Sequence, residues 1–356
     1  MLNLKLNCKA VIVTELSKRK LDVLSAIVKS YIETGDPVGS KNLTLLLENS
    51  PSSATLRNEM NALCNLGFLS QPHTSAGRVP TSSAYKIYIN SLMQQSDLNL
   101  TAKNYINNLL SDVGCDTEII PKSAASALTA LTGYPAIFTC IVDENTFIRQ
   151  VKLLPVSKKT AVLLVVFSDG KTKNSICHIP LGLTADLTLE FTKIVNKSVK
   201  NKKLLDLNKP YLQSVIASSG INALYITPLL AALFDMAENA SQSTAMISGA
   251  HSLYNFCDED KARKVMSFAN NAPAVLNVLG SAENKTSVIF GSDTPYHELQ
   301  NIVMVVGKYY CKDVLCGNVG IIGPDRMDYE QIIPSVQYIS NKITALITDA
   351  VNDMED

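Results

Sequence analysis

The chain has 356 residues, a length that exceeds one ordinary hydrophobic core and predicts two or three domains. Hydrophobic residues make up 46% of it and charged residues 18%, which excludes an intrinsically disordered protein. The formal net charge is zero, but residues 1–90 hold ten Lys or Arg against six Asp or Glu, and the remainder holds 22 against 26. A basic head on an acidic body is typical of a phosphate-binding module joined to a domain that does not bind DNA.

Apolar runs and cysteines predict a cytoplasmic protein. The long apolar run at 161–167 falls well below the roughly 18 residues needed to span a bilayer, and the run at 10–13 is too short for a signal-peptide core. The eight cysteines form no Cys-x-x-Cys pair. We therefore expect buried, reduced thiols and neither a disulfide framework nor a metal site.

Three short helices and a hairpin are expected in the first ninety residues. Apolar residues at helical spacing predict a helix over 17–34, which Gly35 ends. A second helix is expected from a capping Ser40 to about Leu47. A third follows, capped by a serine at 52 or 53. Two short strands are then expected at 68–69 and around 79, and the Gly- and Pro-punctuated loop QPHTSAGR lies between them.

The third helix is the strongest candidate for contact with a DNA major groove. The spacing of Leu56, Met60 and Leu63 predicts its core face, so that polar side chains point outward. Arg57 can bond a guanine through O6 and N7, and the alternative is an ion pair with the nearby Glu59. The outward residues expected on this helix are Thr55, Arg57, Asn58 and Asn61.

Other candidate contacts lie on the second helix and on the loop. Ser40 and Lys41 suit a phosphate because helix N-termini attract anions. Arg78 suits a narrow minor groove or the DNA backbone, with a solvated side chain as the alternative. His73 has a structural bond within the loop as its alternative, and Ser53 has a capping role. The predicted DNA-binding residues are Ser40, Lys41, Ser53, Thr55, Arg57, Asn58, His73, Thr74, Ser75 and Arg78.

The rest of the chain alternates between helical and β patterns. A helix is expected over 81–92, a polar linker over 94–100 and a helix over 101–113. β-Branched and aromatic runs between 136 and 180 predict one antiparallel meander, and 184–245 is expected to be helical. Later strands are expected at AMISGA, SVIFGS, IVMVVGKYY and GNVGIIG, before a closing helix over 329–352.

Catalytic and cofactor patterns are weak throughout the sequence. The glycines of GNVGIIGP lack the strand–loop–helix context of a dinucleotide site, and His178, His251 and His297 lack a second ligand at metal spacing. No Ser-His-Asp grouping or phosphate loop is visible. We therefore expect neither an enzyme nor a bound cofactor or metal.

Several motifs at both ends carry a family resemblance. PVGSKNL, SSATLRNEM and GFLSQPHTSAGRVPTSSAYKIYIN resemble the DNA-binding head of the heat-inducible transcription repressor HrcA family. GAHSLYNF, GSAEN and GNVGIIGPDRMDYEQIIPSVQYIS resemble the C-terminal hallmarks of the same family. The sequence departs from the family in its N-terminal extension, residues 1–15, and at Ser83-Ala84-Tyr85, where a Gly more often precedes the Tyr.

The resemblance implies an α+β fold in three parts. These are a winged helix-turn-helix over 1–95, a GAF-like domain with an antiparallel sheet over 101–183 and 246–356, and an inserted helical dimerising segment over 184–245. It also implies a homodimer that binds an inverted-repeat operator in double-stranded DNA upstream of chaperone operons, and the chaperonin GroEL as the partner that keeps the repressor active. The alternative is a regulator whose GAF-like domain senses a small molecule. An enzyme with an accessory DNA-binding head is disfavoured by the absent catalytic patterns.

Overall fold

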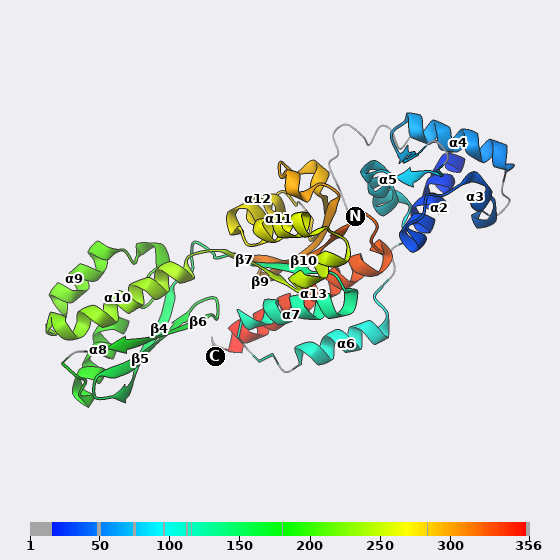
Figure 1. The fold of residues 1–356 in the computed structure, drawn as a ribbon. Helices are drawn as coiled ribbons and strands as arrows, with labels where there is room; N and C mark the ends of the chain where they lie inside the picture. Colours follow the sequence, from blue (N-terminus) through cyan, green and yellow to red (C-terminus); the bar gives the residue numbers. More distant parts are fainter. Residues whose placement is uncertain are drawn as a thin grey trace.

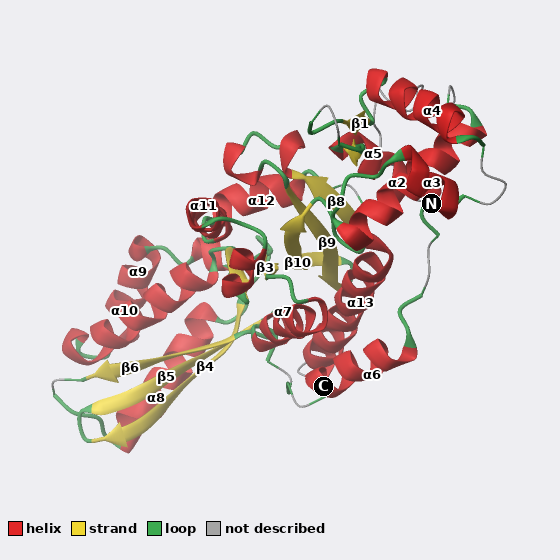
Figure 2. Cartoon of the chain, turned by 45° about the vertical axis from the view of Figure 1, so that its right-hand side comes forward, coloured by secondary structure: helices red, strands yellow, loops and turns green. Residues whose placement is uncertain are grey.

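The computed structural model describes residues 16–47, 51–73, 76–94, 97–111, 113–114, 116–179, 181–282 and 284–353. Three parts lie in a row: a head (16–94), a body (97–140 and 244–353) and an inserted segment (141–243) that leaves the body between two of its strands (Figures 1 and 2). The expected α+β class, with a winged helix-turn-helix head and an antiparallel GAF-like body, is confirmed. No helix within the described residues is long and apolar enough to cross a membrane.

The head has three helices, a two-stranded hairpin and a final helical pair. Ser17 caps its first helix by accepting from the Lys20 N–H at 3.4 Å, and Gly35 ends that helix with a left-handed φ of 74°. The elements are α2 (Lys18–Thr34), α3 (Ser40–Leu46), α4 (Ser53–Asn65), β1 (Leu69–Ser70), β2 (Val79–Pro80), α5 (Ser82–Ile87) and the π-helical turn η1 (Tyr88–Leu92).

Apolar side chains from all three head helices meet in one core. Leu24 and Ile27 of α2, Leu43 of α3, and Leu56 and Leu63 of α4 are fully buried. Burying each of these side chains contributes roughly 1.5–3 kcal/mol. The three helices therefore hold one another, and the opposite face of α4 is left to solvent.

The body is a five-stranded antiparallel sheet covered by helices on both faces. Its strand order is β7-β3-β10-β9-β8. Along β9, Val303 and Val305 join the core that contains α7 and α13, whereas Met304 and Val306 join the core beneath α11 and α12. The elements are α6 (Leu100–Leu110), α7 (Ile119–Thr132), β3 (Ala136–Cys140), β7 (Thr244–Ser248), η3 (Ala250–Asn255), α11 (Glu259–Ala269), α12 (Ala272–Gly280), β8 (Thr286–Phe290), η4 (Gly291–Asp293), η5 (His297–Leu299), β9 (Ile302–Cys311), β10 (Val314–Pro324) and α13 (Tyr329–Asp353).

The single meander expected over 136–180 is wrong, because its first strand belongs to the body. β3 pairs with β10 and β7, whereas the next three strands form a separate sheet in the order β4-β5-β6. Helices pack on one face of that sheet around a core of their own. The elements of the inserted segment are β4 (Ile148–Ser157), β5 (Thr160–Phe167), β6 (Thr172–His178), α8 (Ala185–Val199), η2 (Leu204–Asp206), α9 (Lys209–Ser219) and α10 (Ala223–Ala240).

The neck of the inserted segment joins two neighbouring body strands. The Val142 N–H, just after β3, donates to the Ser243 hydroxyl, just before β7, at 3.2 Å. The core of the segment spans residues 148–240 and therefore includes the three strands. We propose boundaries near 141 and 243 in place of the expected 184 and 245.

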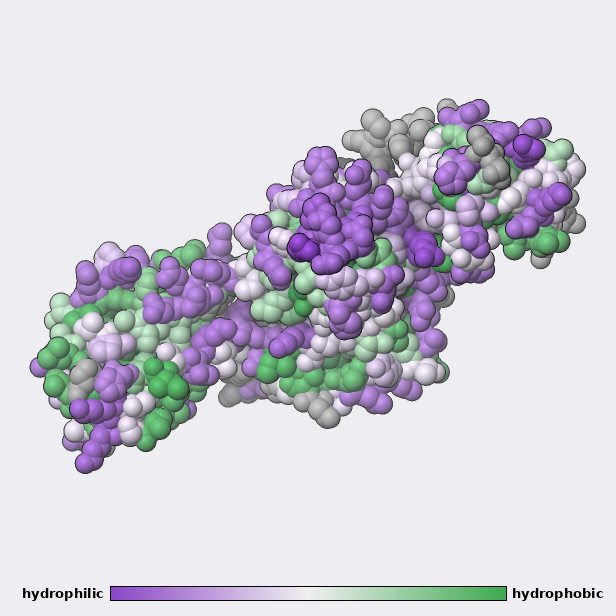
Figure 3. Space-filling view, in the orientation of Figure 1, coloured by the Kyte–Doolittle hydropathy of each residue, from purple (hydrophilic) through white to green (hydrophobic). Residues whose placement is uncertain are grey.

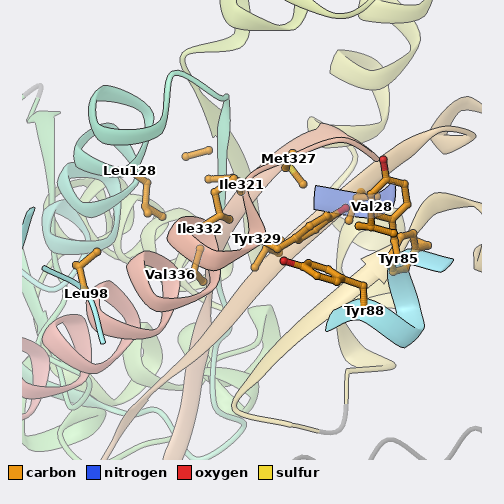
Figure 4. Packing of buried hydrophobic residues seen from close by; sticks show 14 of the residues in the cluster. Val28, Tyr85, Tyr88, Leu98, Leu128, Ile321, Met327, Tyr329, Ile332 and Val336 are labelled. Atoms are coloured by element: carbon orange, nitrogen blue, oxygen red, sulfur yellow. The ribbon is translucent and has the colours of Figure 1, made fainter. Parts of the chain in front are cut away.

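The head is packed directly against the body. The rings of Tyr85 (α5) and Tyr329 (α13) lie 5.9 Å apart, and Tyr88, Met327 and Val28 join the same buried cluster (Figure 4). Polar contacts surround this cluster. The Tyr88 hydroxyl donates to Glu330 Oε1 at 2.6 Å, Lys29 pairs with the same carboxylate at 3.0 Å, and Lys86 pairs with Asp293 at 2.6 Å. We call this contact the head–body joint.

Candidate nucleic-acid interface

The outward edge of α4 is polar, as its sequence pattern predicts. Leu56, Met60 and Leu63 are buried, whereas Arg57, Asn58 and Asn61 are exposed. Arg57 and Asn61 stand one helical turn apart and so share one face.

Arg57 has no ion pair among the described residues. Its alternative partner, Glu59, lies instead within 3.5 Å of Lys20 on α2. That pair ties α4 to α2 and leaves the Arg57 guanidinium at the surface. A surface guanidinium with an unused fork of donors can bond a base edge in bidentate fashion.

Arg78 is held against the same helix. Its backbone forms a single antiparallel bridge with Val38, each N–H donating to the other carbonyl at 2.9 Å. Gly77 permits this approach, since a Cβ there would lie 2.4 Å from the Val38 oxygen. The Arg78 Nη2 then donates to Asn61 Oδ1 at 2.8 Å. We call the hairpin of β1 and β2, with the loop between them, the wing. The wing and α4 therefore present one continuous polar surface.

Two expectations about the serines are corrected by the helix ends. Gly39, and not Ser40, is the N-cap of α3, because Ser40 is already the first helical residue. The Ser40 hydroxyl instead bonds the Ser53 hydroxyl at 2.9 Å and joins the starts of α3 and α4. Ser52, and not Ser53, caps α4 by accepting from the Thr55 N–H at 3.2 Å.

The remaining candidates lie around these helix starts and on the wing. Lys41 is exposed on the first turn of α3. Thr55 is half-buried, with its hydroxyl 3.0 Å from that of Ser52. His73 is exposed on the wing, where its carbonyl accepts from the Ala76 N–H at 2.9 Å. Thr74 and Ser75 lie outside the described residues.

Comparison with known proteins identifies the family. The model of the winged helix-turn-helix transcription repressor HrcA DNA-binding domain matches residues 15–94. The model of the HrcA protein C-terminal domain matches residues 118–333, which is more than half of the chain. The chain belongs to the HrcA family.

Relatives extend over almost the whole chain. The heat-inducible transcription repressor HrcA of Acetivibrio thermocellus is 28% identical over 92% of this chain and 95% of its own length. That of Clostridium tetani is 26% identical over 95% and 98%. A solved structure titled a hypothetical protein superposes with a TM-score of 0.69 at 21% identity, over 94% of this chain and 99% of that one, and so shares the fold.

Membership of the HrcA family makes the chain a winged-helix transcription repressor. Its motif GPDRMDY spans 323–329, inside the range 118–333 that the C-terminal model matches. In this HrcA chain the motif supports the head–body joint. Met327 lies under Gly323, the Tyr329 hydroxyl donates to the Asp325 carbonyl at 2.6 Å, and the Arg326 guanidinium lies against Gly35. These residues help to fix the head relative to the body.

Sequence reasoning placed Asn61 on the outward face but missed its contact with Arg78. Its outward position follows from helical spacing, but its partner Arg78 is 17 residues away along the chain. The pair forms because the bridge to Val38 fixes the direction of the wing, and no local pattern encodes that bridge.

Proposed function

We propose that this repressor binds an inverted-repeat operator as a homodimer and silences chaperone genes in the cytoplasm. The observation that supports DNA binding by the head most directly is the Arg78–Asn61 contact, which joins the wing to the outward edge of α4 in one surface. Each head offers few contacts, so the joining of two heads makes the second binding event intramolecular. A twofold dimer then requires a palindromic site.

Each candidate residue has a role set by its place on that surface. Arg57 reads a guanine from the major groove, and Asn58 and Thr55 contact a flanking base or phosphate. Lys41 contacts a phosphate at the start of α3, together with Ser40 and Ser53. The wing contacts the DNA backbone or the minor groove through Arg78, and His73 is a further contact on it. Thr74 and Ser75, which lie outside the described residues, stay candidates on the sequence alone.

The outer face of the β4-β5-β6 sheet supports a homodimer through the inserted segment. The register places Leu154, Val162 and Ile176 in one row across the three strands. Leu154 is 51% and Ile176 is 75% exposed, and hydrophobic side chains gather over this segment in Figure 3. An apolar row on an open sheet face is typical of a protein–protein contact. A second copy of the chain would bury it symmetrically.

We propose that the chaperonin GroEL keeps the repressor active, as the family resemblance implies; the exposed apolar row supports this proposal. Chaperonins bind apolar surface that partly folded chains expose. During heat stress the chaperonin is occupied by other proteins, and the active fraction of the repressor falls. A gel-shift series with and without chaperonin tests this step. Equal repressor activity in both series would contradict it.

Selection of bound sequences from a random pool of duplex DNA tests the operator. The purified full-length protein should enrich an inverted repeat with two equal half-sites. Enrichment of a single asymmetric site, or of none, would overturn the proposed function.

A further inference from the structure

A cavity of about 580 Å³ lies where the inserted segment meets the body. Its lining comes from both parts. Thr117, Cys140 and Tyr309 belong to the body, whereas Phe147 and Lys171 belong to the inserted segment. The volume lies within the range of small-molecule sites, roughly 300–1,000 Å³. Neither the DNA-binding surface nor the head–body joint contributes to it.

Positive charge dominates the cavity. The lining holds four cationic side chains, Arg149, Lys171, Lys200 and Lys312, against two carboxylates, Asp143 and Asp169. Asp169 pairs with Lys171 at 2.8 Å, whereas Asp143 accepts from the Asn145 backbone and side chain and keeps its charge. A ligand placed here therefore meets an excess of two positive charges.

Lys171 is a buried ammonium with spare donors. Burial lowers its pKa, but Asp169, together with smaller contributions from Cys140 and Glu118, more than offsets this, so the pKa of Lys171 is raised overall. The ammonium has three N–H donors, and the ion pair with Asp169 occupies one side of it. The charge is thus present at neutral pH and can be shared with a second anion.

Thr117 contributes a buried hydroxyl without a partner. The side chain is 5% exposed, it lines the cavity, and its Oγ1 has no hydrogen-bond partner among the described residues. Gly170 of the inserted segment lies close to Thr117, since a Cβ added at Gly170 would lie 2.9 Å from the Thr117 Cγ2. A buried hydroxyl without a partner is costly, and an acceptor atom from a ligand would satisfy it.

The walls beyond these polar groups are largely apolar. Leu315 and Val314 of β10, Ile347 and Val351 of α13, and Phe147 line the cavity. A phosphate alone would leave this lining without contact. A ligand with a hydrocarbon body would fill it, because apolar pockets with a few placed polar groups select such molecules.

We propose that this cavity binds a small carboxylic acid with an apolar body. The carboxylate accepts from Lys171, Arg149 and the Thr117 hydroxyl, and the hydrocarbon part lies against Phe147 and Leu315. Because the lining is shared, occupancy ties the inserted segment to the body. This site is independent of the proposed operator binding.

Isothermal titration calorimetry on the full-length protein tests the site. The probes are butyrate, hexanoate, octanoate, decanoate and benzoate, each beside its neutral amide, and inorganic phosphate alone. At least one carboxylate should bind with one site per chain and about tenfold more tightly than its amide, a difference in binding free energy of about 1.4 kcal/mol. Binding of no carboxylate, equal binding of acid and amide, or binding of phosphate only would overturn the proposal.

Two variants locate the bound carboxylate. Thr117→Val keeps the shape and removes the hydroxyl, and Arg149→Gln removes a part-exposed cation. Each should lower the affinity for the carboxylate severalfold or more. The control Lys152→Gln, at an exposed position on the same strand as Arg149, should leave that affinity unchanged. Unchanged binding in both cavity variants would place the molecule elsewhere and overturn the proposal. Circular dichroism and operator gel shifts on the same samples show whether each variant is folded, and they separate failure of this site from failure of operator binding.

Discussion

Two arginines on one surface differ in how strongly other residues hold their side chains. Arg57 is exposed and unpaired among the described residues, whereas Arg78 is half-buried and bonded to Asn61 at 2.8 Å. The Arg78 Nε is buried and has no partner within the described part of the chain. A guanidinium held in place loses less conformational entropy when it binds. We infer that Arg78 positions the wing and that Arg57 carries most of the base selection.

Replacement of Arg57 should lower both the affinity for the operator and the specificity for its base sequence. Arg57→Ala removes a bidentate base contact worth about 1–3 kcal/mol, so operator affinity should fall by roughly 5- to 150-fold and the preferred base at one position should be lost. Fluorescence anisotropy on operator duplexes with single base changes measures both effects. Arg263→Ala, exposed on α11 of the body, is the control. Intact affinity in Arg57→Ala would mean that α4 does not read the bases.

Replacement of Lys41 should weaken binding to all DNA sequences by a similar factor. Lys41→Ala removes one phosphate contact, so that binding to operator and to unrelated duplex weakens by a similar factor. The slope of log affinity against log salt should also flatten by about one. Titrations at several salt concentrations provide the test. A selective loss on the operator alone would assign Lys41 to base reading instead.

At the scale of elements, the sequence predicted local structure better than it predicted contacts between distant parts of the chain. Helices α2 and α4 and the hairpin strands follow from caps, apolar spacing and Gly/Pro punctuation, and they were predicted close to their bounds. The meander was wrong because β3 and β4 carry the same kind of apolar run, and only tertiary pairing assigns them to different sheets. The helices α7, α11 and α12 were not predicted. The Tyr88–Glu330 contact spans 242 residues and has no local signal.

The head–body joint should respond to pH through Glu330. The Tyr88 hydroxyl, followed by Lys29, lowers the pKa of this carboxyl below its ordinary value. A group with a lowered folded-state pKa stabilises the fold above its unfolded pKa, and this stabilisation is lost as the pH falls through the folded value. Because the Glu330 side chain is 40% exposed, solvent screening keeps the effect small.

Tyr88→Phe tests the joint. The variant should lose about 1 kcal/mol of unfolding free energy at pH 7, and the difference from the parent should shrink toward pH 3. Urea unfolding at a series of pH values measures it. Tyr254→Phe, exposed in η3 of the body, should match the parent throughout. A difference that stays constant with pH would show that the carboxylate is not responsible.

At the scale of the whole molecule, the head is packed against the body, so the proposed dimer contact would set the spacing of the two heads. The inserted segment lies at the far end of the molecule from the head (Figures 1 and 2). Its apolar row, Leu154, Val162 and Ile176, crosses the outer face of the sheet. Contact between two such faces would therefore act on DNA binding through the body, against which the head is packed.

Charges in that row should separate the dimer. The double variant Leu154→Glu and Ile176→Glu places like charges on both copies, so it should sediment as a monomer and bind the operator at least tenfold more weakly, since the second head no longer binds intramolecularly. Leu224→Glu, on the exposed side of α10, is the matched control. A double variant that remains dimeric would exclude this face as the interface.

Footprinting of the purified protein on DNA upstream of its own gene tests the central claim most directly. The account predicts protection of two symmetric half-sites, present with the parent and absent with Arg57→Ala at the same concentration. No protection by the parent, or an identical footprint with Arg57→Ala, would contradict it.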